Sequence, residues 1–370
     1  MNFRKAILIL ALFSPAALAQ AGEFSLGAQY DGWTSDYTPT KDGTEFFFPL
    51  SVYFKANDTF SFYGQTSFAN GSYEYGSTIT LTDFTDSVAG TEIHFDTLGL
   101  PSLLNVGFNI PTGDQTWEEK QTFANIPTEF IDTRYRGRGF GVNGLYGLSF
   151  RLDATSQLGA GVGYLASGSY SPVGLPDLNL GDSVFLTVNR IESFGANKTS
   201  TMRLSSMFFL PSQQGGQTIL QMGPNFDASY GSTDPKGFSW EIGGQFFTSA
   251  ERPLTPGAPV TPEAHNSFGQ RFYLAPSLAL DQLTLAGLVK YITPNDYPTT
   301  DPLYDGGGIL LALDPTWVAP LDAVSDLKFA AGYDFIIAGN AGVDQTDPSG
   351  PRYDVNWNYW SFGATYELKI

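Results

Sequence analysis

The sequence of 370 residues has no cysteine, two histidines and few charged residues. Without cysteine there can be no disulfide framework, thiolate metal site, iron–sulfur cluster or cysteine nucleophile. Charged residues make up 15 % of the chain, against about 25 % in an average globular protein. Acidic residues outnumber basic ones 37 to 19, which gives a net charge of −18. Because Lys and Arg make the phosphate contacts of nucleic-acid binders, we expect no nucleic-acid partner, and the sequence suggests no cofactor.

Long apolar runs are also missing. No stretch reaches 18 uninterrupted apolar residues, so no transmembrane helix is expected. At the N-terminus, Arg4 and Lys5 precede a short apolar run over 6–13 and a small-residue site over 17–19. These features predict a secretory signal peptide over residues 1–19 and a mature chain that begins at Gln20.

Alternation of apolar and small polar residues dominates the rest of the chain. In residues 140–152 one face carries Phe, Val, Tyr and Leu, and the other carries Gly, Asn, Ser and Arg. Residues 158–170 repeat the pattern with Gly and Ser on the second face. A period of two indicates β-strands. A face of small polar residues opposite an apolar one is typical of a membrane barrel with a lipid-facing exterior and a watery lumen.

Sixteen runs of this kind predict an all-β, transmembrane, antiparallel up-and-down β-barrel over residues 20–370. The runs are 23–33, 45–55, 59–70, 77–84, 103–111, 138–152, 157–171, 182–193, 199–210, 217–231, 237–250, 267–280, 283–293, 306–318, 326–338 and 355–370. Short connections alternate with long ones, as periplasmic turns and extracellular loops do in such barrels. The weak run 77–84 leaves 14 or 12 strands open. We expect the outer membrane of a Gram-negative bacterium, with the last strand read by the barrel assembly machinery.

Residues 85–102 lack useful alternation, and we expect this segment to fold into the lumen and narrow it. Charged residues of the strands occupy the same alternate positions as the small polar residues, and this predicts that they line the lumen. They act there on permeating solutes or brace the wall in pairs; the sequence leaves both open. The candidates are Arg151, Arg203, Arg271, Lys290, Lys328, Asp31, Glu241 and Asp334.

No catalytic or metal site is predicted. His265 and Ser267 are two apart, as in a membrane hydrolase, but they follow a proline-rich segment that cannot form a ladder. His94 has no nucleophile beside it. The acidic stretch 295–305 lacks the spacing of a calcium loop, and solvated loop charge is the simpler interpretation. We therefore expect a protein that is not an enzyme.

Arg134, Arg136 and Arg138 share one face if a strand begins there. Their parity is that of the lipid-facing set, so at the outer rim they would contact lipopolysaccharide phosphates. A solvated basic loop and an anion-attracting pore mouth are the alternatives.

Short motifs in residues 80–190 resemble a known family. They are Leu81-Thr82-Asp83-Phe84-Thr85-Asp86, the stretch Val106 to Asp114 that ends Pro-Thr-Gly-Asp, Gly161-Val162-Gly163-Tyr164 and Asn179-Leu180-Gly181-Asp182. In this order they are similar to the outer-membrane channel family linked to meta-pathway phenol degradation, a relative of the long-chain fatty-acid transporters. The resemblance implies a monomeric diffusion channel for small hydrophobic or aromatic molecules, without catalytic residues.

These observations predict a passive outer-membrane channel for small organic solutes, surrounded by membrane lipid. A structural or adhesive barrel whose acidic loops meet a partner is the alternative from another class. An outer-membrane hydrolase is the third.

Overall fold

The computed structural model describes residues 21–36, 42–75, 77–113, 139–170, 177–179, 181–194, 198–250, 267–294, 307–342 and 353–369. These residues form strands and turns. Among them, no helix is long and apolar enough to cross a membrane. The predicted signal peptide over 1–19 lies outside the described residues.

Twenty strands are present in the described part of the chain. They are β1 (Ala21–Ser35), β2 (Asp42–Lys55), β3 (Phe60–Tyr75), β4 (Ser77–Phe84), β5 (Ser87–Thr97), β6 (Leu100–Ile110), β7 (Gly141–Arg151), β8 (Ser156–Ala166), β9 (Ser169–Tyr170), β10 (Leu178–Asn179), β11 (Ser183–Phe194), β12 (Lys198–Phe209), β13 (Ser212–Gln214), β14 (Gln217–Thr233), β15 (Phe238–Ala250), β16 (Ser267–Leu280), β17 (Leu283–Ile292), β18 (Gly308–Pro320), β19 (Ser325–Gly342) and β20 (Tyr353–Lys369).

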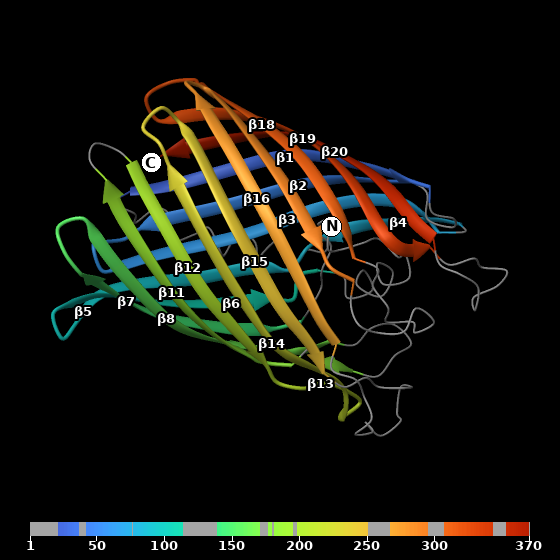
Figure 1. Cartoon of the computed structure of the whole chain (residues 1–370), viewed down its shortest axis with the longest axis horizontal. Helices are drawn as coiled ribbons and strands as arrows, with labels where there is room; N and C mark the ends of the chain where they lie inside the picture. Colours follow the sequence, from blue (N-terminus) through green and yellow to red (C-terminus); the bar gives the residue numbers. More distant parts are fainter. Residues whose placement is uncertain are drawn as a thin grey trace.

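The strands close into one antiparallel barrel of 16 strand positions. The barrel strands pair in sequence order, with β8 beside β11 and β12 beside β14. The last strand, β20, returns to pair with β1 over thirteen register positions, from Glu23↔Lys369 to Ser35↔Trp357. Figure 1 shows this closure, with the blue β1 beside the red β20. The strands β4 and β5 share one position, and the short β9, β10 and β13 lie outside the barrel ladder. The predicted fold class and the count of 16 are confirmed.

One end of the barrel carries the short connections, and we call it the turn end. Four of its turns are built in the same way, around an Asn or Asp side chain. Asn57 Oδ1 accepts from the backbone N–H of Thr59 at 2.8 Å, and Asp153 Oδ1 accepts from that of Thr155 at 2.7 Å. Asp234 and Asp322 repeat the bond to the residue two further on. Such Asx turns fix a tight reversal locally, so each hairpin's register is set at this end.

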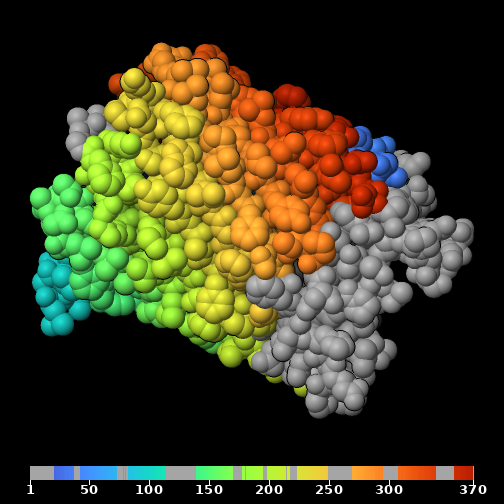
Figure 2. Space-filling model, viewed as in Figure 1, coloured from blue at the N-terminus to red at the C-terminus, as the bar shows by residue number. Residues whose placement is uncertain are grey.

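Large apolar side chains cover the outside of the barrel. Along every barrel strand they alternate with the residues of the inner face, and many are 40–58 % exposed. Figure 2 shows the side chains from green to red closing the spaces between strands into a continuous wall. A water-soluble protein would bury these groups, so this exterior fits the hydrocarbon of a membrane.

Aromatic rings pair across neighbouring strands at two heights on this exterior. The pairs near the turn end are Phe54–Phe62, Phe95–Tyr146, Tyr230–Trp240 and Trp317–Phe329. The pairs towards the other end are Tyr30–Phe46, Phe68–Phe84, Phe108–Phe140, Phe208–Phe226 and Phe246–Phe272. Two aromatic girdles that bound an apolar band are the mark of a transmembrane barrel.

The fourth strand position corrects one prediction. Residues 87–97 form β5, which pairs with β3 on one side and β6 on the other, so the expectation that 85–102 folds into the lumen is wrong. The strand is interrupted at Thr85 and Asp86. Before the break Phe84 faces outward, paired with Phe68; after it the outward face passes to odd positions such as Ile93, paired with Phe60. Because the outward-facing positions shift by one residue at the break, the sequence shows no continuous alternation across this segment.

Candidate functional site

The lumen face of the barrel is the candidate site. The ladders place all eight predicted residues on it, because each shares the face opposite the exposed apolar set. They come from seven strands around the barrel. Arg203 on β12 and Asp31 on β1 are eight steps apart in the order β12, β14, β15, β16, β17, β18, β19, β20, β1, which puts them on opposite walls.

Basic groups gather on the wall from β12 to β17, with polar partners between them. Arg271 donates from Nη1 to Gln245 Oε1 at 2.9 Å, and its guanidinium carbon lies 4.7 Å from the centre of the Phe247 ring. One residue row further, Tyr273 pairs with Lys290 in the ladder and its hydroxyl donates to Glu241. Stacking on a ring and a bond to an amide hold the guanidinium flat against the wall, so its charge faces the lumen from a fixed position.

Carboxylates dominate the wall from β18 to β2. Asp31 is 3 % exposed and accepts hydrogen bonds from Tyr359 Oη at 2.7 Å and Gln29 Nε2 at 2.8 Å. Asp334 is the ladder neighbour of Tyr359, and Asp314 lies one strand away, close enough for the two carboxylates to repel each other. Among the described residues, no hydrogen bond or ion pair joins either of these two carboxylates to a basic group. Both carboxyls therefore stand on this side of the lumen without a basic partner among the described residues.

Ion pairs brace the lumen wall at the turn end. Lys328 Nζ lies 2.6 Å from Glu367 Oε1, and Lys369 Nζ lies 2.8 Å from Asp326 Oδ2, across β19 and β20. Arg151 donates to the backbone carbonyls of its own turn, at 3.1 Å to Asp153 and 3.4 Å to Ala154. For these residues the structure favours the bracing role over contact with solute.

The wall from β6 to β11 is rich in glycine and mainly uncharged, with Arg151 at its turn end and Glu92 on the neighbouring β5. A hollow of about 350 Å³ lies on it, between His94 and Leu103 on one side and Asn189 and Ile191 on the other. Glycines let side chains of the next strand lie flat on the wall: Asn189 covers Gly159 in this way. The lumen is therefore lined by small groups here and by charged groups on the two remaining sides.

An apolar cluster sits within the lumen, beside the acidic wall. Its buried members are Trp33, Phe47, Ala69, Leu310, Ile336, Ala338, Val355 and Trp357. By ladder parity all lie on the inner face, and Trp33 is the partner of Tyr359. All eight side chains are at most 5 % exposed, so the cluster is a packed part of the inner face, bordered by the partly buried Leu288, Ala312 and Tyr359.

The network around Asp86 explains the motifs of the predicted resemblance. Asp86 accepts from the Gly113 backbone N–H at 3.0 Å and from Asn109 Nδ2 at 2.8 Å, and Thr112 Oγ1 donates to the Thr85 carbonyl at 2.7 Å. The Thr-Asp and Pro-Thr-Gly motifs therefore meet where β4 passes into β5 and where β6 ends. Their role here is to hold the break in the wall.

The structure places two of the remaining candidates and leaves the others outside the described residues. Ser267 begins β16, whereas His265, the acidic stretch 295–305 and Arg134, Arg136 and Arg138 lie outside the described residues. His94 Nε2 lies 4.0 Å from Glu92 Oε2 on the same strand. No group of His, Asp and Glu in that region could hold a metal ion.

The sequence analysis did not name several acidic lumen residues, among them Glu45, Glu92, Asp227, Asp314 and Asp326. Glu45, Asp227 and Asp314 lie in runs recognised as strands, so their parity could have identified them. Glu92 lies in β5, which the break at 85–86 concealed.

Comparisons with known proteins agree with the architecture. No protein-family model and no curated protein match the chain. Among solved structures, OccAB1 of Acinetobacter baumannii is similar with a TM-score of 0.52 and 9 % identity, over 95 % of this chain and 98 % of that one. OccK7 (OpdD) of Pseudomonas aeruginosa has a TM-score of 0.48 and 10 % identity, over 95 % and 100 % of the chains. OmpT, an outer membrane protein of Vibrio cholerae, has a TM-score of 0.42 and 10 % identity, over 94 % and 98 %. The likeness to OccAB1 shows a shared barrel fold, and the resemblance to the phenol-pathway family stays a prediction.

Proposed function

We propose that the protein is a passive diffusion channel of the outer membrane for small organic solutes with an apolar or aromatic part. The observation that carries this proposal is the contrast between the two faces of one closed wall. The exterior is apolar and bounded by aromatic girdles, and the inner face carries fixed charges on two sides and small neutral groups on the third. A charged inner face is costly unless it meets water, so the barrel is suited to hold an aqueous path.

The solute class rests on the lumen surface. The apolar cluster around Trp33 and Trp357 lies beside Asp31 and Asp334, while Arg271 and Lys290 stand on the adjoining wall. The partly buried Leu288, Ala312 and Tyr359 at the border of the cluster offer apolar surface next to these charges for a solute with an apolar body and a polar group. The predicted family resemblance points the same way.

The test is conductance in planar bilayers, with uptake measured in a strain that has no other large channel. We expect stepwise currents from the purified protein and uptake of small aromatic solutes that rises linearly with concentration. A folded barrel that gives neither current nor uptake would favour the structural or adhesive alternative. Folding is checked on gels, where a closed barrel in detergent migrates differently before and after boiling, since its ladder has no free edge.

The location and partners follow as part of the same proposal. The turn end faces the periplasm, as short turns do in outer-membrane barrels. The signal peptide over 1–19 directs export, the barrel assembly machinery inserts the chain, and Arg134, Arg136 and Arg138 contact lipopolysaccharide. Fractionation with the outer membrane of a Gram-negative host is the expected result, and recovery as soluble periplasmic protein contradicts it.

A further inference from the structure

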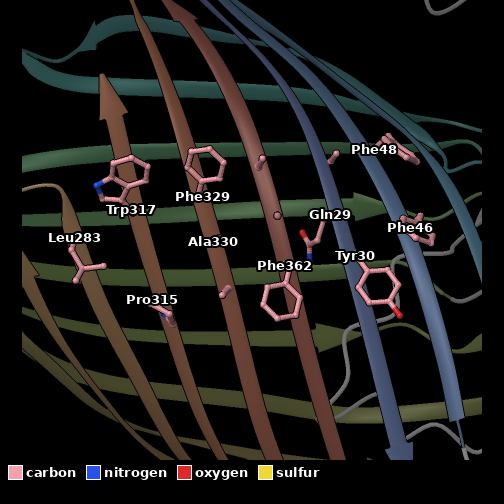
Figure 3. Close-up of a pocket in the computed structure, with 14 residues that line it drawn as sticks. Gln29, Tyr30, Phe46, Phe48, Leu283, Pro315, Trp317, Phe329, Ala330 and Phe362 are labelled. Carbon is pink, nitrogen blue, oxygen red and sulfur yellow. The ribbon is translucent and has the colours of Figure 1, made fainter. Parts of the chain in front are cut away.

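A slot on the lipid-facing surface crosses β17, β18, β19, β20, β1 and β2. It encloses about 620 Å³, a size within the range of roughly 300–1,000 Å³ that is typical of small-molecule sites. Figure 3 shows its lining, with Trp317 and Phe329 side by side at one end, Phe46 and Phe48 at the other, and Phe362 and Tyr30 between them.

The slot follows the ladder of the sheet. One row of directly paired outward residues runs Leu283, Trp317, Phe329, Ala364, Ala28. The row beside it runs Ala331, Phe362, Tyr30, Phe46. The first row begins with rings near the turn end and continues with Ala364 and Ala28, whose small side chains form a shallow floor. The rings of the second row stand along one side of this floor as a wall. Phe362 is 58 % exposed and forms the highest part of that wall.

The position and length of the slot match one leaflet of a membrane. Between Trp317 on β18 and Phe48 on β2 the slot spans five neighbouring strands, whose four spacings of about 4.8 Å give roughly 19 Å. At a strand tilt of about 45° this row rises by about 13 Å, close to half of the roughly 30 Å hydrocarbon core. Trp317 is three residues from Pro320, the last residue of β18, and Phe48 is seven from Lys55, the last of β2. The slot therefore starts near the turn end and finishes deeper in the membrane.

We propose that this slot holds one acyl chain of a phospholipid from the periplasmic leaflet. The assignment of the leaflet rests on the proposed function, which places the turn end in the periplasm. The lining is mainly apolar, with Gln29 and the hydroxyl of Tyr30 as polar members. At the entrance, Trp317 Nε1 donates to Gln282 Oε1 at 3.2 Å, as a ring at the interface between hydrocarbon and headgroups does. The chain lies along the two alanines, Ala28 and Ala364, between the rings.

The experiment is native mass spectrometry of the folded barrel after incubation with palmitoyl-oleoyl phosphatidylethanolamine and extensive washing in detergent. We expect the wild type to retain one phospholipid per barrel. The double variant Ala28→Leu and Ala364→Leu fills the floor and should retain it about tenfold less, since each lost methylene contact weakens binding several-fold. Phe362→Ala removes the wall without filling the floor and should also reduce retention.

The matched control is Ala228→Leu, on the outward face of β14, which should retain lipid as the wild type does. Equal retention in the filled variant and the wild type, or an equal loss in the control, overturns the proposal. Preferential retention of lipopolysaccharide, or a dimer that the filled variant disrupts, overturns it in favour of another occupant. If the wild type retains phospholipid but carries no current, the proposed channel function is refuted and the proposed phospholipid site stands. If the wild type carries current but retains no phospholipid, the proposed phospholipid site is refuted and the proposed channel function stands.

Discussion

Tyr273 of β16 lies over Gly243 of β15, with its ring in the place that a β-carbon at position 243 would take. The hydroxyl of this ring donates to Glu241, which lies two residues before the glycine on the same strand. The glycine therefore allows a large side chain to lie along the lumen wall rather than across the opening.

Gly243→Val should turn Tyr273 into the lumen, because the ring and a branched side chain cannot share that space. We expect lower single-channel conductance and a loss of about 1–3 kcal/mol in stability, which is typical of overpacking. Gly144→Val is the control, since no heavy atom lies within 4 Å of a β-carbon at that outward position. Unchanged conductance in a folded Gly243→Val barrel would contradict this account.

The acidic wall predicts a preference for cations. Asp314 and Asp334 lie close enough to repel each other, and within the described residues no hydrogen bond or ion pair joins either of them to a basic group. Asp314→Asn and Asp334→Asn should shift the reversal potential in a potassium chloride gradient towards anion passage, because fixed carboxylates attract mobile cations. Asp322→Asn, at an exposed turn, should leave it unchanged. If the lumen variants have no effect, these carboxylates do not face the ion path.

Asp86→Ala should loosen the break between β4 and β5. It removes the carboxylate that accepts hydrogen bonds from Gly113 and Asn109 and leaves these two donors without that partner. The free energy of unfolding should fall by about 1–3 kcal/mol. The temperature at which the folded gel band disappears should fall. Asp96→Ala, in β5 but near the turn end, is the comparison, and an equal fall there would show that the network has no special role.

The Asx turns predict loss of stability in acid. Hydrogen bonds from Thr155 hold the pKa of Asp153 below its ordinary value, and those from Val324 and Ser325 do the same for the pKa of Asp322. A carboxyl with a lowered folded pKa stabilises the fold above its unfolded pKa of about 3.9, and this contribution is lost as the pH falls through the folded value.

The melting temperature measured between neutral and strongly acid pH checks this expectation. The double variant Asp153→Asn and Asp322→Asn keeps an acceptor oxygen at each turn but does not titrate. It should show a shallower fall in acid than the wild type, and parallel curves would contradict the prediction.

Most of the barrel could be predicted from the sequence, because a wall between lipid and water imposes a strict period of two. The lipid-facing parity of residues such as Phe150 and Leu148 was correct for this reason. The failure at 85–102 has an equally local cause. The break at Thr85 and Asp86 moves the outward face from even to odd positions, so no single period covers β4 and β5.

The lumen site was only partly predictable. Parity identifies which face a residue occupies, and it placed Arg271 and Asp31 on the inner wall. It carries no information about contacts between strands far apart in the sequence, such as Asp31 with Tyr359, which lie 328 positions apart. Whether a charge is paired, like Lys328, or left facing the lumen, like Asp334, depends on those contacts.

The ladder between β1 and β20 also bears on how the chain reaches its native state. It joins Glu23 to Lys369, so the step that closes the wall needs the two most distant strands of the barrel to meet. Contacts between such remote segments are slow to form, because the loop entropy is lost before the pairing is gained. Until then β1 and β20 each expose a full edge of unpaired backbone groups. A chain that lacks β20 should therefore have the same strands available but remain an open, aggregation-prone sheet.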